Sequence, residues 1–292
     1  MTLADRKVAV VGLGLMGGSF AAAIRGRCRA VVGVDRDAEA LETALMAGLV
    51  SQATHSLAEG LAEADIVLLA TPVRTTLQLI DSVRVLAKPG ALVMDVGSTK
   101  REIVEAMERL PEHLWAIGGH PMCGKERSGI GAADPNLYRG CTFVLTPLSR
   151  TPPPALALAL SLVSALGARP LILDAERHDR LAAAISHLPY LLACALVRCA
   201  DDVAREDPTV WKLASSGFRD TSRLAASDIT MMLDILMTNR DAVLKALDVA
   251  EQHLKHLRGW LEVGDEAALR AALQEARWVR VAWHTENERK DG

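Results

Sequence analysis

A glycine-rich turn near the start of the chain has the spacing of a phosphate-binding loop. It follows the short apolar run 8–11 directly and leads into a segment of small residues. The residues of this glycine loop are Gly12, Gly14, Leu15, Met16 and Gly17. The first glycine permits a tight turn, the second lets the backbone approach a pyrophosphate, and the third lets a helix pack closely on a strand. Free N–H groups at the N-terminus of that helix would hold the phosphates.

An acidic residue lies where a dinucleotide-binding unit needs one. The apolar run 30–34 ends in Asp35, about 20 residues beyond the glycine loop, where a carboxylate can accept hydrogen bonds from the adenosine ribose. The carboxylate also repels a 2′-phosphate and so favours NAD over NADP, while Arg36 beside it could meet that phosphate. A tight turn followed by a surface aspartate is the alternative. The order of strand, glycines, helix, strand and acid favours the dinucleotide site.

Three further apolar runs end in residues that can take part in chemistry. Thr71 and Pro72 follow the first of these runs, Ser98 lies beyond the second, and His120 follows the third. Because ligands bind outside the carboxyl ends of parallel strands, these residues are expected to face one crevice with the cofactor. A histidine beside a nicotinamide is a natural base for the proton of an alcohol that loses hydride, and Ser98 could orient its ring. Many histidines are structural, but a position at a strand end favours catalysis for His120.

Strands and helices alternate through the first 173 residues. Expected strands cover 8–11, 30–34, 65–70, 91–95, 115–118, 141–146 and 170–173. Expected helices cover 16–24, 38–47, 75–86, 99–110 and 155–166. Thr99 and Glu102 have the spacing of a capping box for the fourth of these helices. The alternation predicts an α/β, Rossmann-type domain with a doubly wound parallel sheet over residues 1–173.

From Asp174 onward the strand pattern disappears. Asp174 is expected to cap a long helix that Pro189 interrupts, and helical patterns continue to residue 284. This all-helical domain, residues 174–292, has more apolar surface than one small bundle needs to bury. We therefore expect a homodimer formed through the C-terminal helices.

Composition and charge argue against several other classes of protein. The formal net charge of the 292 residues is −3, and mixed charges without a basic stripe argue against a nucleic-acid partner. The longest apolar stretch, 181–197, is interrupted by Ser186, His187 and Pro189 and is expected to be a buried helix, not a membrane span. The chain enters its first strand without room for a signal peptide.

The cysteines and the remaining histidines predict neither a disulfide framework nor a metal site. The chain has 5 cysteines, an odd number with no CxxC pair, which fits reduced thiols and a cytoplasmic location. His253 and His256 share a helical pattern without an acidic partner, so no metal is expected there.

Five motifs together resemble the prephenate/arogenate dehydrogenases of tyrosine biosynthesis. The motifs are GLGLMGGS at 12–19, GSTK at 97–100, GHPMCGKE at 119–126, SHLPY at 186–190 and GFRDTSR at 217–223. They cover nearly the whole chain in the right order, and the last three are far more specific than the glycine loop.

The resemblance implies roles for individual residues. His120 would deprotonate the C4 hydroxyl of a cyclohexadiene, with Ser98 hydrogen-bonded to His120. The implied substrate-binding residues are Arg223, which would hold the side-chain carboxylate, His187, Tyr190 and Glu126, the last near the site entrance. Many relatives have a second histidine where this chain has Tyr190, so recognition of the ring is expected to differ in detail.

The resemblance also implies a reaction and a fold. Hydride would pass from C4 of prephenate to NAD⁺, the C1 carboxylate would leave as CO₂, and the ring would become aromatic, giving 4-hydroxyphenylpyruvate. The family pairs a Rossmann domain with a helical dimerisation domain, which matches the predicted division at residue 173.

Three alternatives stay open. An arogenate (cyclohexadienyl) dehydrogenase is the first, although Arg219 and Lys125 would disfavour the ammonium group of arogenate if they faced the pocket. A β-hydroxyacid dehydrogenase would instead use a lysine on a helix of the second domain. A non-catalytic NAD-sensing module would make no chemical demand on Ser98, His120 or Arg223.

Overall fold

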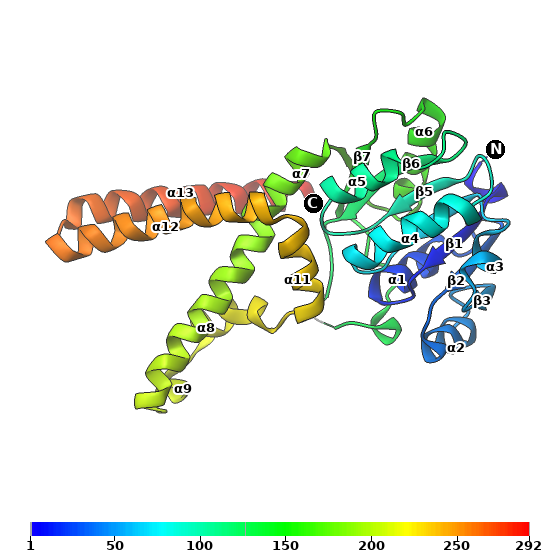
Figure 1. The fold of residues 1–292 in the computed structure, drawn as a ribbon. Helices are drawn as coiled ribbons and strands as arrows, with labels where there is room; N and C mark the ends of the chain where they lie inside the picture. Colours follow the sequence, from blue (N-terminus) through cyan, green and yellow to red (C-terminus); the bar gives the residue numbers. More distant parts are fainter. Residues whose placement is uncertain (1, 126, 292) are drawn as a thin grey trace. The chain divides into compact units, whose positions relative to one another are not determined.

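The computed structural model describes residues 2–125 and 127–291, with side chains described as far as residue 285. The chain divides into two compact units, Met1–Arg240 and Asp241–Gly292 (Figure 1). The first unit contains the sheet and all of the predicted cofactor and catalytic residues.

Within the described residues, eight strands form one sheet in the order β3-β2-β1-β4-β5-β6-β7-β8. The strands are β1 (Lys7–Val11), β2 (Ala30–Val34), β3 (Gln52–Thr54), β4 (Ile66–Leu69), β5 (Leu92–Asp95), β6 (Trp115–Pro121), β7 (Thr142–Pro147) and β8 (Arg169–Ile172). The seven predicted strands are present at these places. Strand β3 was not predicted, because three residues of mixed polarity give no hydrophobic period.

The sheet is parallel except where β7 runs antiparallel to β6. The connection between these two strands carries the short 3₁₀ segment η2 (Ile130–Ala132), and a strand can return antiparallel without a crossover helix. Strand β8 follows the helix α6 and pairs with β7 in parallel. The predicted doubly wound architecture is confirmed, with this one antiparallel pairing added.

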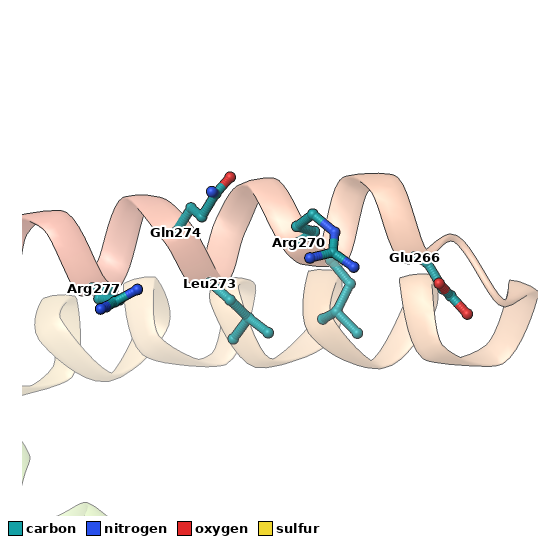
Figure 2. Close-up of a pocket in the computed structure, with 6 residues that line it drawn as sticks. Glu266, Arg270, Leu273, Gln274 and Arg277 are labelled. Atoms are coloured by element: carbon teal, nitrogen blue, oxygen red, sulfur yellow. The ribbon is translucent and has the colours of Figure 1, made fainter.

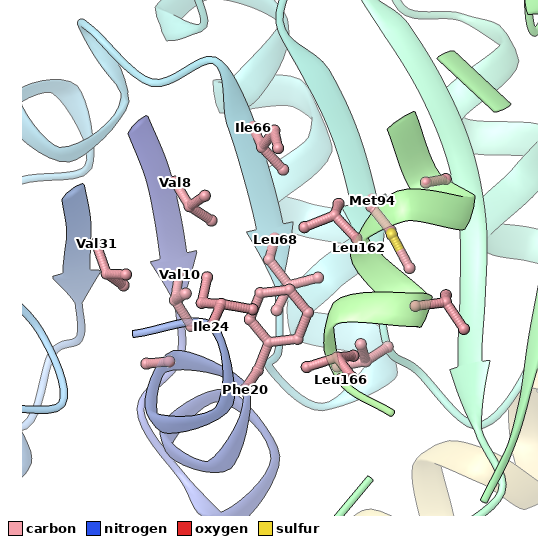
Figure 3. Close-up of a cluster of buried hydrophobic side chains, with 14 of the residues drawn as sticks. Val8, Val10, Phe20, Ile24, Val31, Ile66, Leu68, Met94, Leu162 and Leu166 are labelled. Atoms are coloured by element: carbon pink, nitrogen blue, oxygen red, sulfur yellow. The ribbon is translucent and has the colours of Figure 1, made fainter. Parts of the chain in front are cut away.

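Helices cover both faces of the sheet. They are α1 (Leu15–Ile24), α2 (Ala38–Met46), α3 (Leu57–Leu61), α4 (Val73–Leu86), α5 (Arg101–Glu108) and α6 (Pro153–Ala165), after a short 3₁₀ segment η1 (Leu3–Asp5). Side chains of β1 alternate between the two faces. Val8 and Val10 belong to the hydrophobic cluster that packs against α1, α2 and α6. Ala9 and Val11 belong to the cluster on the other face, which packs against α3, α4 and α5. Figure 3 shows the first cluster, in which Phe20 of α1 packs against the sheet. Burying each such side chain contributes about 1.5–3 kcal/mol.

The first unit continues into helices beyond the sheet. They are α7 (Ala175–Ala182), the π-helical turn η3 (Ala183–His187), α8 (Leu188–Glu206), α9 (Val210–Leu213), α10 (Ser216–Ser222), the 3₁₀ segment η4 (Arg223–Ala226) and α11 (Ile229–Thr238). The Asp174 side chain accepts a hydrogen bond from the Arg177 N–H at 2.8 Å and caps α7, as predicted. Pro189, which has no N–H to donate, lies two residues beyond the end of the π-helical turn.

Long-range polar contacts tie these helices to the sheet domain. The Asp234 carboxylate on α11 accepts from the Arg74 N–H at 3.1 Å, and the hydroxyls of Thr99 and Thr238 lie 2.8 Å apart. These contacts help to keep the helices 175–238 in the same compact unit as the sheet, which ends at residue 240. The predicted domain boundary at residue 173 stays a prediction.

The expectation that 181–197 forms a buried helix is wrong, because Leu181, Ile185 and Leu192 are exposed. By length and composition alone the continuous helix 175–206 could cross a membrane.

The predicted capping box at the start of α5 is wrong. Thr99 is bonded to Thr238 across the fold, and the position before the helix is occupied by Lys100. The Asp179 carboxylate accepts from the Lys100 N–H at 2.7 Å and from the Arg101 N–H at 2.9 Å, so it caps α5 from α7. A distant carboxylate thus does what the local threonine was expected to do, because it satisfies two free N–H groups at once.

The second unit is built from two long helices, α12 (Arg240–Val263), which begins one residue before it, and α13 (Glu266–Asp291). Gly264 has φ +70° in the turn between them, and the Asp265 side chain accepts from the Ala268 N–H at 2.9 Å to begin α13. Figure 2 shows a groove on one face of α13, with Leu273 lying among the arginines and Gln274. Large apolar side chains are exposed along both helices, among them Leu254, Leu261, Leu273, Trp278 and Trp283.

Candidate active site

The glycine loop has the geometry of a dinucleotide cradle. Gly12 has φ +93°, and a Cβ there would lie 2.7 Å from the Ala70 carbonyl oxygen, so only glycine fits this turn. A Cβ on Gly17 would lie 1.8 Å from the Gly12 oxygen, which is the close helix–strand packing expected of the third glycine. Gly14 has no heavy atom within 4 Å of its Cβ position, and this opening can admit a phosphate. Leu15 and Met16 form the first turn of α1.

The ends of β2 and β4 lie on either side of this loop. The half-buried Asp35 accepts from the Leu13 N–H at 2.6 Å through Oδ2 and from the Asp37 N–H at 3.0 Å through Oδ1. Its carboxylate is therefore held against the glycine loop, while Arg36 is exposed beside it. These contacts fit a bound dinucleotide, whose ribose the carboxylate would meet.

Thr71 and Pro72 follow β4, at the same carboxyl edge of the sheet. The Thr71 and Thr76 hydroxyls lie 2.9 Å apart, and the Thr71 methyl group lies 2.9 Å from the position of a Cβ on Gly12. Pro72 precedes α4 as its capping residue. The predicted cofactor contacts therefore lie together along one edge.

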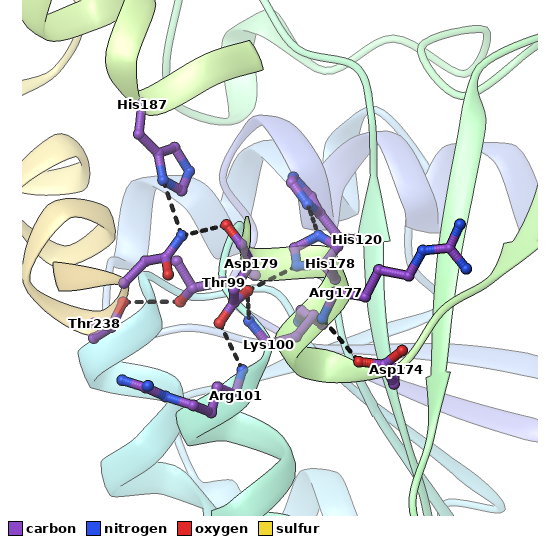
Figure 4. A network of polar contacts seen from close by, with 12 residues as sticks. Thr99, Lys100, Arg101, His120, Asp174, Arg177, His178, Asp179, His187 and Thr238 are labelled. Atoms are coloured by element: carbon purple, nitrogen blue, oxygen red, sulfur yellow. Dashed lines mark hydrogen bonds and ion pairs between the residues drawn. The ribbon is translucent and has the colours of Figure 1, made fainter. Parts of the chain in front are cut away.

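His120 lies near the end of β6 and begins a chain of hydrogen bonds (Figure 4). Its Nδ1 is 2.8 Å from Nε2 of His178, and Nδ1 of His178 is 2.7 Å from Oδ1 of Asp179. A carboxylate can only accept hydrogen bonds, so His178 donates from Nδ1 to Asp179. The Nε2 of neutral His178 then accepts, and His120 donates from Nδ1. His120 is therefore the tautomer protonated on Nδ1, and its Nε2 has a free lone pair, as a general base needs.

The electrostatic surroundings keep His120 neutral. Burial lowers its pKa well below the ordinary value of 6.5, and unfavourable electrostatic interactions with His178, Lys100 and His187 lower it further. A neutral imidazole can accept a proton, whereas an imidazolium cannot.

Beneath His120 lies a fully buried ion pair between Lys100 and Asp95. The Asp95 carboxylate also accepts from the Gly97 N–H at 2.7 Å and from the Gly119 N–H at 3.0 Å. Asp95 therefore joins the end of β5 to β6 one residue before His120. Burial lowers the pKa of Lys100, and the charge of Asp95 opposes that shift. Such a paired and hydrogen-bonded charge fixes the two strand ends in one arrangement.

His187 contributes a third imidazole to the network. Asn239 donates from Nδ2 to the Asp179 carbonyl oxygen at 2.7 Å and lies 3.2 Å from Nδ1 of His187. If the amide donates to Nδ1, the proton of the neutral ring is on Nε2. Burial lowers the pKa of His187 to about 4, so the ring stays neutral and can donate a hydrogen bond to a ligand.

The other predicted site residues are placed differently. Ser98 is half-buried, but within residues 2–125 and 127–291 it makes no hydrogen bond to His120, whose Nδ1 is bound by His178. The expected Ser98–His120 bond is therefore absent, and a role for Ser98 stays a prediction. Tyr190 is half-buried on α8, and Arg223 is exposed at the start of η4. The prediction for Glu126 falls outside the described residues.

Sequence reasoning missed His178, Asp179, Asn239 and Asp95. His178 and Asp179 could have been found from their position in the first turns of α7, the helix that directly follows β8. Asp95 could have been noticed as an acid at a strand end. Within the described part of the chain, no group of three or more His, Cys, Asp or Glu side chains is placed to hold a metal ion.

Comparison with protein families decides the relationship. Residues 20–172 match the nucleotide-binding domain of prephenate dehydrogenase, and residues 174–275 match its dimerization domain. The chain belongs to the prephenate dehydrogenase family. It is an NAD-dependent oxidoreductase of this family, and the predicted fold class is confirmed.

Prephenate dehydrogenases of known sequence and structure resemble nearly the whole chain. The enzyme of Lactococcus lactis is 36% identical over 282 residues, covering 95% of this chain and 77% of that protein. The structure of the A. aeolicus prephenate dehydrogenase with hydroxyphenyl propionate and NAD⁺ has 32% identity and a TM-score of 0.89, covering 97% of this chain and 99% of that one. The Synechocystis arogenate dehydrogenase has 34% identity and a TM-score of 0.82, covering 95% and 99%. A Mycobacterium tuberculosis 3-hydroxyisobutyrate dehydrogenase, at 16% identity, shares the fold alone.

Proposed function

We propose that this chain catalyses the NAD⁺-dependent oxidative decarboxylation of prephenate to 4-hydroxyphenylpyruvate, with His120 as the base. The observation that carries this proposal is the hydrogen-bonded chain from His120 through His178 to Asp179, which leaves the His120 Nε2 free to accept a proton. His120 lies at the same carboxyl edge of the sheet as the glycine loop. The reaction is a step of tyrosine biosynthesis, and a cytoplasmic location fits it.

The residues of the site would act on the substrate hydroxyl and on the cofactor. Bound NAD⁺ would supply the acceptor for hydride from C4. The glycine loop, Asp35, Thr71 and Pro72 would hold it. His120 takes the hydroxyl proton, and the resulting imidazolium is stabilised by its hydrogen bond to His178, which Asp179 orients. As the C1 carboxylate leaves as CO₂, its bonding electrons enter the ring, which becomes an aromatic phenolate. The His120 imidazolium then returns its proton to the phenolate oxygen to give 4-hydroxyphenylpyruvate. The protein therefore needs only to orient the substrate and to hold one proton for a time.

Arg223 is the proposed anchor for the side-chain carboxylate of the substrate, because a guanidinium binds a carboxylate in a planar, bidentate manner. His187 and Tyr190 would line the ring pocket, with Glu126 near its entrance. Burial and Cys194 raise the pKa of Tyr190, so its hydroxyl keeps its proton and can donate.

The choice between prephenate and arogenate depends on one substituent, a ketone in prephenate and an ammonium in arogenate. Lys125 was expected to disfavour the ammonium, but its charge is paired with Asp134 at 2.8 Å. Arg219 is also close to an acid, with Asp220 at 3.9 Å. Charge therefore favours prephenate only weakly. Arogenate is the second candidate substrate, and the likeness to the Synechocystis arogenate dehydrogenase favours it.

The test is the rate of NADH formation with prephenate, arogenate and a 3-hydroxy acid, measured on the parent enzyme and on Arg223→Ala. We expect kcat/KM to be highest for prephenate. In the variant, KM for prephenate should rise much more than kcat falls, because the anchor serves ground state and transition state alike. Faster turnover of arogenate would reverse the substrate assignment. An unchanged KM in the variant would remove Arg223 from the site.

The homodimer proposed for this chain rests on its second unit and on the matched family model, which is that of a dimerization domain. Leu273 and Trp278 are 56% and 72% exposed on α13, and this is more apolar surface than a solvated helix needs. A second copy of the chain is the proposed partner.

A further inference from the structure

Two cysteines face each other next to the proposed catalytic histidine. Strands β6 and β7 are antiparallel, with His120 opposite Val144 and Pro121 opposite Phe143. The ladder continues past the strand ends, because the Met122 N–H donates to the Thr142 carbonyl oxygen at 2.8 Å. Cys123 and Cys141 are the next residues on the two sides, and their thiols are close enough to form a side-chain hydrogen bond with each other.

The hydrogen-bond pattern shows which kind of cross-strand pair this is. The Arg169 N–H donates to the Cys141 carbonyl oxygen at 2.8 Å, so the Cys141 carbonyl points to β8 and away from β6. The Cys123 N–H bonds locally, to the Pro121 oxygen at 2.8 Å. The Cys123 N–H and the Cys141 carbonyl thus make no hydrogen bond to each other, as in a non-hydrogen-bonded cross-strand pair, whose Cα atoms are typically about 4.5 Å apart. A disulfide spans Cα separations of about 4.4–6.8 Å, so this register suits one.

The two thiols also differ in chemical character. Both are free and half-buried. The interaction with the Cys123 thiol lowers the pKa of Cys141, and the positive charge of Arg169 adds to that effect against the opposing effect of burial. The same interaction and burial raise the pKa of Cys123. Because the positive charge of Arg169 favours the thiolate of Cys141, we assign Cys141 as the nucleophile and Cys123 beside it as the resolving thiol.

A bond between these cysteines would connect two parts of the active site. Cys123 lies three residues after His120. The Cys141 N–H donates to the Tyr138 carbonyl oxygen at 3.1 Å, and the Tyr138 hydroxyl donates to the Met16 carbonyl oxygen at 2.7 Å. The pair therefore lies between the segment that carries the base and a segment that holds the glycine loop.

We propose that Cys123 and Cys141 form a redox-sensitive pair that closes into a cross-strand disulfide in the presence of a peroxide and lowers turnover. The Cys141 thiolate attacks one peroxide oxygen, the O–O bond breaks, and a sulfenic acid and water form. The Cys123 sulfur then displaces the hydroxyl group of the sulfenic acid, which leaves as a second water. Two thiols are oxidised and one peroxide is reduced, and a dithiol such as dithiothreitol reverses the change.

The experiment treats the full-length enzyme with hydrogen peroxide and follows both the linkage and the activity. We expect peptide mass spectrometry to find a Cys123–Cys141 linked peptide, and the count of free thiols to fall from five to three. Turnover should fall about tenfold or more, since a shift of His120 by a fraction of an ångström is costly, and dithiothreitol should restore it. The linkage is read without any activity assay, so its failure is distinguishable from failure of the proposed reaction.

Two variants control for other thiols. Cys141→Ser should keep parental turnover, form no linked peptide and resist inactivation by peroxide. Cys199→Ser, which removes an exposed thiol on α8, should behave like the parent. The proposal is overturned if the parent yields only sulfenic or sulfinic acid at these positions. It is also overturned if the linked peptide forms without loss of turnover, or if peroxide inactivates Cys141→Ser as strongly as the parent.

Discussion

At the scale of single residues, the chemistry depends on which nitrogen of His120 carries the proton. The carboxylate of Asp179 fixes the tautomer of His178, and His178 in turn fixes that of His120. The base is therefore prepared before substrate binds. The lowered pKa keeps His120 neutral at the start of the reaction, as a base must be.

The pH dependence of the rate follows from that lowered pKa. His120 acts as a base only when it is neutral, and its pKa lies well below 6.5. The parental kcat/KM should therefore stay level as pH falls towards 6.5 and decline only at more acidic values, as the imidazole becomes protonated. A pH profile of kcat/KM with prephenate measures this. A decline that begins above pH 6.5, or a rate that rises on acidification, would contradict the assigned environment of His120.

Cofactor preference is also decided by a single residue. Asp35 would accept from the ribose hydroxyls and repel a 2′-phosphate, so kcat/KM should be higher with NAD⁺ than with NADP⁺. Asp35→Ser should narrow the difference, with some loss of stability because Asp35 also accepts from the Leu13 N–H. Exposed Asp37, two residues away, gives a control as Asp37→Ser, which should leave the preference unchanged. A parental preference for NADP⁺ would refute the role of Asp35.

At the scale of elements, one carboxylate connects α7, α5 and β6. Asp179 caps α5 through two backbone N–H groups and orients the imidazole chain that ends on β6. This position explains why the helix after β8 belongs to the compact unit that carries the sheet.

The substitution Asp179→Asn tests both functions of this residue. An amide cannot hold the His178 tautomer as a carboxylate does, so kcat should fall by about 10²–10⁴, as when the orienting aspartate of an acid–base triad is replaced. The weakened cap should cost about 0.5–2 kcal/mol of stability. NAD⁺ affinity should stay parental, since the glycine loop is untouched. Thermal unfolding, NAD⁺ titration and steady-state kinetics measure these effects.

Asp202→Asn at an exposed position of α8 is the matched control and should leave all three quantities unchanged. If Asp179→Asn loses stability but keeps the parental kcat, Asp179 caps α5 and has no role in catalysis.

The same element shows what sequence reasoning can and cannot reach. The glycine loop, Asp35 and the position of His120 at a strand end follow from local periodicity, because strand, turn and helix are encoded by near neighbours. The cap of α5 comes from a residue 78 or 79 positions away, and Thr99 bonds 139 positions away. No local pattern contains such pairings. The capping box failed for this reason, and His178 was overlooked.

At the scale of the whole molecule, the sheet-bearing unit holds the predicted chemistry and the second unit presents exposed apolar helices. We expect light scattering to give a mass twice that of the 31.3 kDa chain. Leu273→Glu combined with Trp278→Glu should shift the population to monomer, because charges would be buried in an apolar interface. Lys255→Glu, which changes an exposed charge on α12, should not. A parent that stays monomeric at all concentrations, or a dimer that survives the double substitution, would contradict this assembly.

A comparison of the parent enzyme with His120→Asn decides whether this molecule oxidises prephenate with His120 as the base. With prephenate and NAD⁺, the parent should form NADH and 4-hydroxyphenylpyruvate in equal amounts. His120→Asn should bind NAD⁺ as the parent does, because the glycine loop and Asp35 are unchanged, while kcat falls by about 10²–10⁴. Near-parental turnover by His120→Asn would place the base elsewhere, and a parent that leaves prephenate unoxidised would contradict the proposed function itself.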